Sequence, residues 1–472
     1  MFLSPRNFSY LAIVAMLSGC VAVAKGEPEG TEVNRDHANL HCELEQNKQQ
    51  PDLTNPLAID IHIDGSGSML GYINQENSSY IQALKLLDST LALSSRHSQP
   101  TVKYYRSGDY QHQAKGLTRS EFRKAHKSEF YDGKNPAFPA VSSDLGSLIT
   151  KPKNSDRLTV IVTDLEQNDG DVNLIANKIK ENYFNSKDKN YAVGIWAVKS
   201  EFNGTVYSPS DANKKFNYNT EGKTSKQYRP FYILFLGDSQ DIANYFDKLA
   251  KEQGNLSDYA TAYPTDRSKF SIFSPHNLVA DVSYLNSPVN LSSDLAAPNL
   301  LHNGDVSVEK NNQPIELLEI KNKNADALEV KYQLPLKQIN HTLSADPNDL
   351  KVAIDISAFD KFNKQQFKQA PAAEKALDFK DWQINDNQLE FVTTINPKNF
   401  TESNIYYFKV DVTAKDLQKP DWWNEWNLNS GSDGSKTSNL YGFMNSLKNI
   451  TLNSMNESTL TIGRLCYAVQ KD

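Results

Sequence analysis

The sequence has no long hydrophobic run, no block of basic residues and only three cysteines. Its one strongly apolar stretch, Tyr10–Leu17, is too short to span a bilayer, which takes about 20 apolar residues. The 50 lysines and arginines are outnumbered by 57 aspartates and glutamates, so the net charge is −7. No segment has the basic face that nucleic acid or anionic lipid requires. A polytopic membrane protein is excluded, and no nucleic-acid partner is expected.

Zinc-binding patterns are also missing. There is no Cys-x-x-Cys, and the nine histidines include no pair at metal-ligand spacing. The chain does contain 21 Phe, 22 Tyr and 5 Trp, enough to build substantial cores, so a disordered chain is excluded. A length of 472 residues predicts two or three domains.

The first twenty residues have the pattern of an export signal. Arg6 precedes the apolar stretch Tyr10–Leu17, as in a secretory signal peptide. The stretch ends in Leu17-Ser18-Gly19-Cys20, which resembles the lipobox of bacterial lipoproteins. That resemblance implies removal of residues 1–19, acylation of Cys20 and a bacterial cell-envelope location, at the outer membrane because Val21 is not Asp. The alternative is an ordinary signal peptide with a chance cysteine.

Two cysteines remain once Cys20 is set aside. In an oxidising periplasm Cys42 and Cys466 are expected to form a disulfide that ties the two ends of the mature chain together. Two buried free thiols are the alternative.

The mature chain divides into three parts by composition and periodicity. Residues 20–55 are polar and predict a flexible tether. Residues 56–253 alternate strand and helix patterns, and residues 265–472 are mostly β.

The middle part predicts an α/β fold with a doubly wound, mostly parallel, Rossmann-like sheet. Its expected strands are Ala58–Ile63, Thr101–Tyr105, Leu158–Val162, Tyr191–Val198 and Pro230–Leu236. Its expected helices are Tyr80–Leu93, a short turn at Asp144–Ile149, Asp171–Tyr183 and Asp241–Lys251. The polar stretch Phe202–Gln227 predicts a hairpin that leaves the sheet.

The last part alternates apolar and polar residues, which is typical of antiparallel strands with one buried face. We expect a sandwich-like domain containing Leu328–Leu334, Lys351–Ile356, Leu389–Ile395, Ile405–Val412 and Thr459–Ile462. One late helix is expected near Leu440–Leu447.

The motif that carries chemistry is Asp64-Gly65-Ser66-Gly67-Ser68, directly after the first strand. Ligands bind at this end of strands in doubly wound sheets. A tight loop can direct three oxygens at alternate positions toward one point, and hard oxygen donors suit Mg²⁺, with Mn²⁺ or Ca²⁺ as alternatives. A phosphate-binding loop would need Gly-Lys-Ser/Thr, and a nucleophile elbow would need Gly-x-Ser-x-Gly. This loop contains neither pattern. The remaining alternatives are a loop that only caps a helix and a degenerate metal site.

Asp-x-Ser-x-Ser after a first buried strand resembles the metal-ion-dependent adhesion site of von Willebrand factor type A (VWA) domains. The family completes this site with a Thr from a middle loop and an Asp after a later central strand. Those positions correspond here to Ser143, in place of the usual Thr, and to Asp164. The resemblance implies direct coordination by Ser66 and Ser68, and an open position for a carboxylate from a protein partner.

Three tryptophans, Trp422, Trp423 and Trp426, form a second candidate site. Clustered tryptophans anchor interfaces or stack on ligands, and they also pack elements onto a sheet. Both roles remain open for this cluster at this point.

We therefore expect a lipid-anchored binding protein, not an enzyme, that captures a protein partner through a divalent metal. It would contact the membrane through its lipid only. The alternatives are a hydrolase that uses a loop serine, and a structural envelope-assembly module with a vestigial metal loop.

Overall fold

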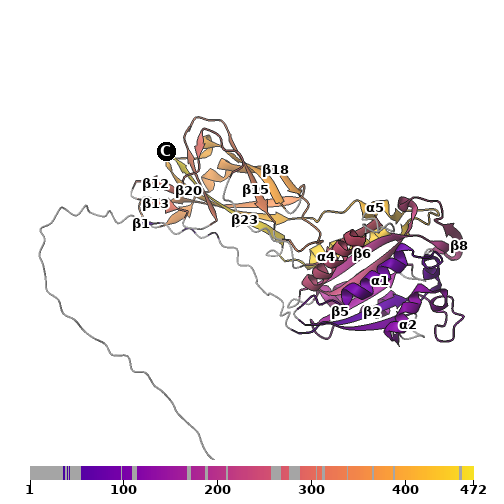
Figure 1. The fold of residues 1–472 in the computed structure, drawn as a ribbon. Helices are drawn as coiled ribbons and strands as arrows, with labels where there is room; N and C mark the ends of the chain where they lie inside the picture. Colours follow the sequence, from indigo (N-terminus) through magenta and orange to yellow (C-terminus); the bar gives the residue numbers. More distant parts are fainter. Residues whose placement is uncertain are drawn as a thin grey trace, which may run out of the picture.

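The computed structural model describes residues 36–37, 40, 42, 55–96, 98–108, 114–166, 172–185, 190–208, 211–256, 267–275, 288–304, 306–310, 314–336, 338–363, 366–385, 388–456 and 460–472. The predicted signal, the lipidation site Cys20 and nearly all of the tether lie outside these residues. Figure 1 shows a mixed α/β region and a β-rich region. In the part of the chain that is described, no helix is both long and apolar enough to cross a membrane.

The α/β region is built on a seven-stranded sheet with the order β10-β6-β9-β5-β2-β3-β4. The strands are β2 (Ala58–Asp64), β3 (Thr101–Ser107), β4 (Lys115–Leu117), β5 (Arg157–Thr163), β6 (Tyr191–Ser200), β9 (Arg229–Asp238) and β10 (Ser268–Phe273). The centre, β5-β2-β3, is parallel as predicted, and the other pairs are antiparallel. The sheet is therefore mixed.

The antiparallel strand β9 follows from the chain's path. Strand β6 leads into the predicted hairpin, β7 (Asn203–Ser208) and β8 (Asp211–Asn219), with no crossover helix. Because parallel neighbours require a long crossover, the chain returns antiparallel, between β5 and β6.

Helices cover both faces of this sheet, so its strands are apolar on both sides. On β9, Phe231, Ile233 and Phe235 belong to one core, and Tyr232 and Leu234 belong to the other. The first core is closed by α1 (Ser79–Leu91) and α4 (Ser239–Leu256), and the second by α3 (Val172–Ile179), its π-helical continuation η5 (Lys180–Phe184) and α6 (Leu440–Ser454). The predicted helices are thus present.

The β-rich region consists mainly of a six-stranded sheet, β11-β14-β23-β20-β16-β17, and a three-stranded sheet, β15-β19-β18. The larger sheet contains β11 (Leu295–Ala296), β14 (Ile315–Ile320), β16 (Leu350–Phe359), β17 (Phe367–Gln369), β20 (Asn404–Ala414) and β23 (Thr461–Lys471). The smaller sheet contains β15 (Leu328–Pro335), β18 (Leu377–Asn385) and β19 (Gln388–Ile395). Tyr332 of β15 packs on Tyr467 of β23, with ring centroids 5.9 Å apart, so the two sheets share a core.

Two smaller sheets complete the strands of the described residues. They are β1 (Asp36–His37) with β13 (Val306–Glu309) and β12 (Leu300–Asn303), and β21 (Asn427–Leu428) with β22 (Thr437–Ser438).

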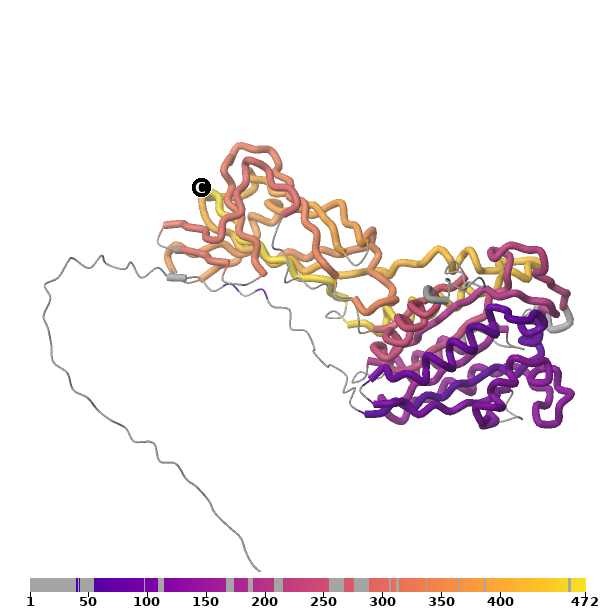
Figure 2. Tube along the Cα trace, in the orientation of Figure 1, coloured from indigo at the N-terminus to yellow at the C-terminus, as the bar shows by residue number. Residues whose placement is uncertain are grey.

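The C-terminal part of the chain contributes to both regions. Strand β10 extends the α/β sheet, and the segment Trp422–Ser454, with α5 (Trp422–Glu425) and α6, packs on the same region before β23 returns to the β-rich one. In Figure 2 this yellow segment runs out to the α/β region. The predicted unit 265–472 therefore does not fold as one continuous block.

The three tryptophans, for which the sequence left binding and packing open, are buried. Trp422, Trp423 and Trp426 are 5%, 0% and 4% exposed, and Trp423 stacks on Phe273 of β10 at 5.7 Å. The rings have no free face for a ligand because they fix the C-terminal segment onto the sheet. Packing is their role.

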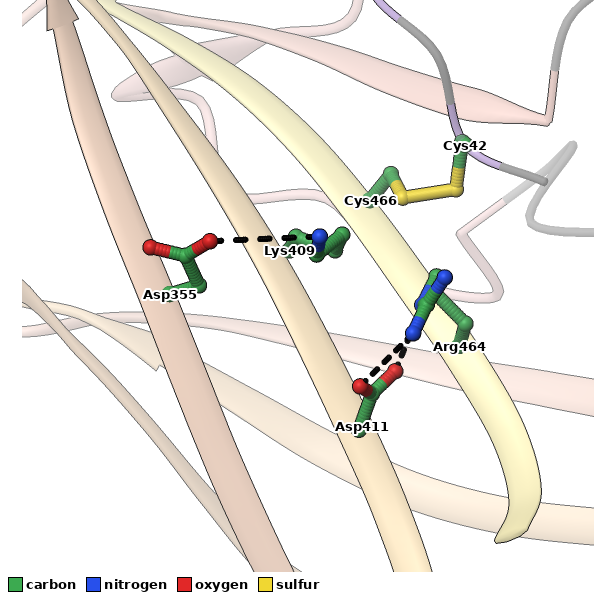
Figure 3. Close-up of a disulfide and its surroundings, with 6 residues drawn as sticks. All are labelled: Cys42, Asp355, Lys409, Asp411, Arg464 and Cys466. Atoms are coloured by element: carbon green, nitrogen blue, oxygen red, sulfur yellow. Dashed lines mark hydrogen bonds and ion pairs between the residues drawn. A yellow bond between two sulfur atoms is a disulfide. The ribbon is translucent and has the colours of Figure 1, made fainter. Parts of the chain in front are cut away.

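Cys42 and Cys466 form a disulfide (Figure 3). The sequence had left a disulfide and two buried free thiols as alternatives. Their Cα atoms are 6.1 Å apart, and both side chains are buried in a small apolar cluster with Leu40 and Phe359. The bridge attaches the N-terminal segment to the middle of β23.

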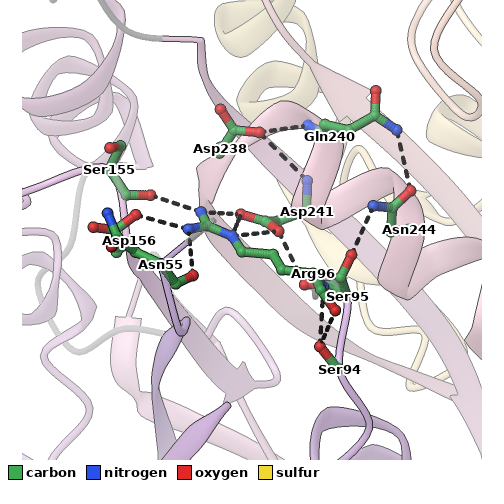
Figure 4. A network of polar contacts seen from close by, with 10 residues as sticks. All are labelled: Asn55, Ser94, Ser95, Arg96, Ser155, Asp156, Asp238, Gln240, Asp241 and Asn244. Carbon is green, nitrogen blue, oxygen red and sulfur yellow. Dashed lines mark hydrogen bonds and ion pairs between the residues drawn. The ribbon is translucent and has the colours of Figure 1, made fainter. Parts of the chain in front are cut away.

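A polar network lies at the start of β5, the opposite end of this strand from the candidate site (Figure 4). The buried Arg96 guanidinium donates to Asp241 of α4 and to Asp156, which precedes β5, with shortest distances of 2.6 and 2.7 Å. It thereby ties the start of α4 to the start of a central strand.

Candidate metal centre

The loop after β2 is held in place by its neighbours on β3. Gly65 donates its backbone N–H to the Ser107 carbonyl at 2.9 Å, and Arg106 donates to the Gly65 carbonyl at 3.0 Å. A Cβ on Gly65 would lie 2.6 Å from Arg106 Nε, whereas a Cβ on Gly67 would meet nothing within 4 Å. The first glycine is therefore required by close packing, and the second faces open space.

Asp64 organises the site through both carboxylate oxygens. Oδ1 accepts the backbone N–H of Ser66 at 2.9 Å. Oδ2 accepts the hydroxyls of Ser143 at 2.7 Å and Thr163 at 3.0 Å. Residues from the two predicted loops therefore meet at one carboxylate, although 79 residues separate Asp64 from Ser143.

The two loop serines face each other. Ser66 Oγ lies 3.1 Å from Ser68 Oγ, and both side chains are buried. Ser66 begins the 3-10 helix η1 (Gly67–Tyr72), yet its side chain makes no capping hydrogen bond. The Ser66 side chain therefore does not cap this helix, which argues against a loop that serves only as a helix cap.

Asp164 follows β5 and is completely buried. Its Oδ1 accepts the backbone N–H of Glu166 at 3.1 Å. Its Oδ2 is buried and has no hydrogen-bond partner among the described residues. Leu165, the next residue, has a left-handed backbone with φ = +59°, a conformation that costs energy for a leucine. The turn thus holds a buried carboxylate of which one oxygen has no hydrogen-bond partner among the described residues.

The charges around Asp164 are unbalanced. Glu166 pairs with the buried Arg229, whereas neither Asp64 nor Asp164 forms an ion pair within the described part of the chain. Burial, with the Glu166 charge as the next cause, raises the pKa of Asp164 well above its usual range. An unpaired buried carboxylate is costly, so this environment favours an added positive charge.

The donor set fits a small divalent cation. Two ligands at right angles around Mg²⁺, each about 2.1 Å from it, lie about 3 Å apart, close to the separation of the two serine hydroxyls. Ser143 supplies a third hydroxyl, and the unsatisfied Asp164 oxygen supplies charge. The described residues contain no group of three or more His, Cys, Asp or Glu side chains suited to a metal, so the candidate ligands of this site are mainly hydroxyls.

The structure thus links the predicted residues Asp64, Ser66, Ser68 and Ser143 by hydrogen bonds. Among the described contacts, none joins Asp164 to these four residues, although the Asp64 charge helps to raise the pKa of Asp164. Roles for Thr163, Glu166 and Arg229 were not predicted from the sequence. For Arg229, the available signal was an arginine at the start of β9, a strand that is otherwise mostly apolar.

Two neighbouring segments border the site. The β7–β8 hairpin approaches Glu166 through the Tyr207 N–H, at 3.4 Å, and Gly204 packs directly on Gly71 of η1. From the C-terminal segment, the Gly434 carbonyl accepts a hydrogen bond from Arg229 at 3.1 Å. The surroundings of the site are therefore assembled from distant parts of the chain.

Comparison with known proteins gives no family. No protein-family model matches this chain, and none of the curated proteins compared with it matches either.

Proposed function

We propose that this chain is a binding protein whose α/β region is a VWA-type domain with a metal-ion-dependent adhesion site. The observation that carries the proposal is the buried Asp164 Oδ2, which has no partner among the described residues and follows β5, the parallel neighbour of the strand β2 that leads into the loop of Asp64, Ser66 and Ser68. Side chains with a purely structural role would satisfy one another, whereas this set leaves a charge to be balanced.

Ser66, Ser68 and Ser143 would hold Mg²⁺ through their hydroxyl oxygens, with Mn²⁺ or Ca²⁺ as alternatives. Asp64 orients the Ser143 hydroxyl and fixes the loop through the Ser66 N–H. Asp164 would contribute negative charge from the turn after β5. The bound ion would supply a positive charge and an open coordination position. A carboxylate of a protein partner would fill that position, so capture of the partner would depend on the metal.

The sequence of the first twenty residues supports a lipid anchor at Cys20 and a place in the bacterial cell envelope, at the outer membrane. The membrane contact would be through this lipid alone.

The two alternatives have less support. A hydrolase needs a base beside its serine, but the Ser66 hydroxyl contacts Ser68, and no described histidine contacts either of them. A vestigial metal loop would not require a buried, unsatisfied carboxylate at Asp164.

The test is titration of Mg²⁺ into the mature chain with Cys20→Ser, beside Asp164→Asn. The Asn variant removes the unpaired charge, so it should unfold at higher urea concentration without metal and lose the metal's effect. In the unchanged chain, Mg²⁺ at 100-fold its Kd should stabilise the fold by about 2.7 kcal/mol. Gly67→Ala is the matched control, because it lies in the same loop and meets nothing.

The proposal fails if Mg²⁺, Mn²⁺ and Ca²⁺ leave the stability of the unchanged chain unaltered at millimolar concentration. It also fails if Asp164→Asn and Gly67→Ala respond to metal equally.

A further inference from the structure

A basic surface, called here the basic edge, lies at the β4 side of the α/β sheet. It is formed by α1, by β4 and by the turns that follow β4, which are α2 (Arg119–Phe122) and the 3-10 helix η2 (Arg123–His126). Its cations are Lys85, Lys115, Arg119, Arg123, Lys124 and Lys127, and its carboxylates are Asp88, Glu121 and Glu129. The basic edge therefore has three positive charges in excess, on a chain whose net charge is −7.

The cations of α1 and those of the following turns share one surface. Arg119 pairs with Asp88 of α1 at 2.9 Å, and Lys85 lies one helical turn before Asp88. Burial lowers the pKa of His126, and the charges of Lys85 and Arg123 both lower it further. Two cations from different elements therefore act on the same imidazole.

The carboxylates within the basic edge are engaged by other groups. Glu121 accepts the backbone N–H and the hydroxyl of Thr118 at 2.8 and 2.9 Å, in the capping box that starts α2. Glu129 lies 3.9 Å from Lys124, at the limit of an ion pair. Three exposed cations form no ion pair within the described part of the chain, namely Lys85, Arg123 and Lys127. These charges are available to an anion from outside.

The basic edge begins beside the loop of the candidate metal centre. Lys115 pairs in register with Arg106 of β3, whose guanidinium holds that loop. Lys115 and Lys124 both lie over the Phe138 ring, 5.1 and 5.6 Å from its centre. Arg106 lies over the same ring at 5.8 Å, and Phe138 is five residues before Ser143. A ligand seated at the metal centre can therefore extend onto the basic edge.

The mixture of charges favours carboxylates that are carried by a protein. A nucleic-acid backbone or an anionic bilayer presents phosphates at uniform spacing, so some of them would face the three carboxylates that lie among the cations. A folded protein or a peptide can place its carboxylates beside the cations and avoid these positions. Complementary charges of this kind steer a partner toward the surface and fix its orientation.

We propose that the basic edge docks an acidic segment of the protein partner whose carboxylate would bind the metal. The identity of that partner rests on the proposed function, which this docking surface deepens. The basic edge contains none of the candidate metal ligands, so its attraction for acidic chains can be measured with the metal removed.

The experiment follows the fluorescence anisotropy of labelled poly-L-glutamate as the mature Cys20→Ser chain is added, in chelator at low salt. The chain should bind saturably although its own net charge is negative, and its affinity should fall as salt is added. Arg123→Glu and Lys127→Glu should each weaken binding about tenfold, because each variant loses an attraction and gains a repulsion.

Lys351→Glu is the matched control, since Lys351 is an exposed lysine of β16 in the β-rich region. It should bind poly-L-glutamate as the unchanged chain does, and all three variants should keep the urea midpoint of that chain. The proposal is overturned if poly-L-glutamate does not bind or if the three charge reversals weaken binding equally. It is also overturned if DNA or phosphatidylglycerol vesicles bind more tightly than poly-L-glutamate.

Added Mg²⁺ distinguishes the basic edge from the metal centre. It should tighten binding to the unchanged chain, whereas Asp164→Asn should keep the affinity measured in chelator. Binding in chelator without any effect of Mg²⁺ would support the basic edge and count against the metal centre. Binding that needs Mg²⁺ and is unaffected by Arg123→Glu and Lys127→Glu would support the metal centre and overturn the docking proposed here.

Discussion

Arg229 shows how a single residue can link distant parts of this chain. Its buried guanidinium pairs with Glu166 and donates to the Gly434 carbonyl of the C-terminal segment. Because Glu166 has this partner, Asp164 is the carboxylate of the turn that forms no ion pair among the described residues. The arginine accordingly defines the electrostatics of the candidate metal centre without contacting the serine hydroxyls in the described structure.

The two glycines of the loop predict opposite mutational effects. Gly65→Ala forces a Cβ against the buried Arg106, which cannot move because it also donates to the carbonyls of Phe130 and Pro139. We expect a loss of about 1–3 kcal/mol in the free energy of unfolding, as for other overpacked sites. Gly67→Ala should change it by about 0.5 kcal/mol or less. Urea denaturation of both variants checks this, and equal losses would contradict the packing described for Gly65.

At this scale the sequence was most informative where residues are close along the chain or belong to a known pattern. Asp64, Ser66 and Ser68 lie within five positions, and Ser143 and Asp164 were found through the family resemblance. Arg229 could not be found in this way, because its partner Glu166 is 63 residues away and no local pattern marks the pair.

At the scale of elements, the start of α4 depends on a buried carboxylate. Asp238 Oδ1 accepts the backbone N–H groups of Gln240 and Asp241 at 2.9 and 3.4 Å. Burial, with the neighbouring Asp241 charge as the next cause, raises the pKa of Asp238 from 3.8 to about 6. The folded state therefore binds a proton more tightly than the unfolded state does.

This cap predicts a pH-dependent stability. Because the folded pKa is raised, the contribution of Asp238 is most favourable below about pH 4 and is lost as the pH rises to about 6, by up to about 3 kcal/mol. Asp238→Asn keeps the acceptor and removes the titration, so it should be the more stable protein at pH 7 and lose that advantage at pH 4. Urea denaturation at several pH values checks this. A constant difference between the two proteins at every pH would contradict it.

Element type was easier to predict than element direction. The continuous apolar run Phe231–Leu236 in β9, and the alternate apolar residues of β15, identified both strands correctly. The direction of β9 depends on the hairpin before it, which replaces a crossover helix, and no pattern within β9 records that. Helix α6 was identified too, but its packing on α3 is a tertiary choice that its own periodicity does not specify.

At the scale of the whole molecule, the Cys42–Cys466 disulfide closes a loop across a separation of 424 residues. Loops of this size gain most from a crosslink, since the unfolded chain loses the most freedom. We expect the double variant Cys42→Ala/Cys466→Ala to lose about 2–5 kcal/mol of stability, with the loss appearing in the β-rich region.

Hydrogen exchange of β23 and urea denaturation measure that loss. A reductant should destabilise the unchanged chain to the same extent and have no effect on the double variant. If β23 exchanges equally fast in both proteins, the crosslink does not stabilise this region.

Domain organisation was predicted only in outline. The change from alternating strand-and-helix patterns to β patterns comes after β10, which still belongs to the α/β sheet, and not at residue 265. The chain then returns to the α/β region at Trp422–Ser454 and leaves it again. Such returns depend on contacts between distant segments, such as Trp423 on Phe273, which composition and periodicity do not encode.

The position of the disulfide also has a mechanical consequence. A pull on the chain before Cys42 is transmitted through the sulfur atoms to the middle of β23, which β14 holds on one side and β20 on the other. To yield, the strand must slide past two ladders at once, which resists tension better than peeling one strand from an edge. If Cys20 is anchored as proposed, tension on the tether enters the fold at this strongly held strand.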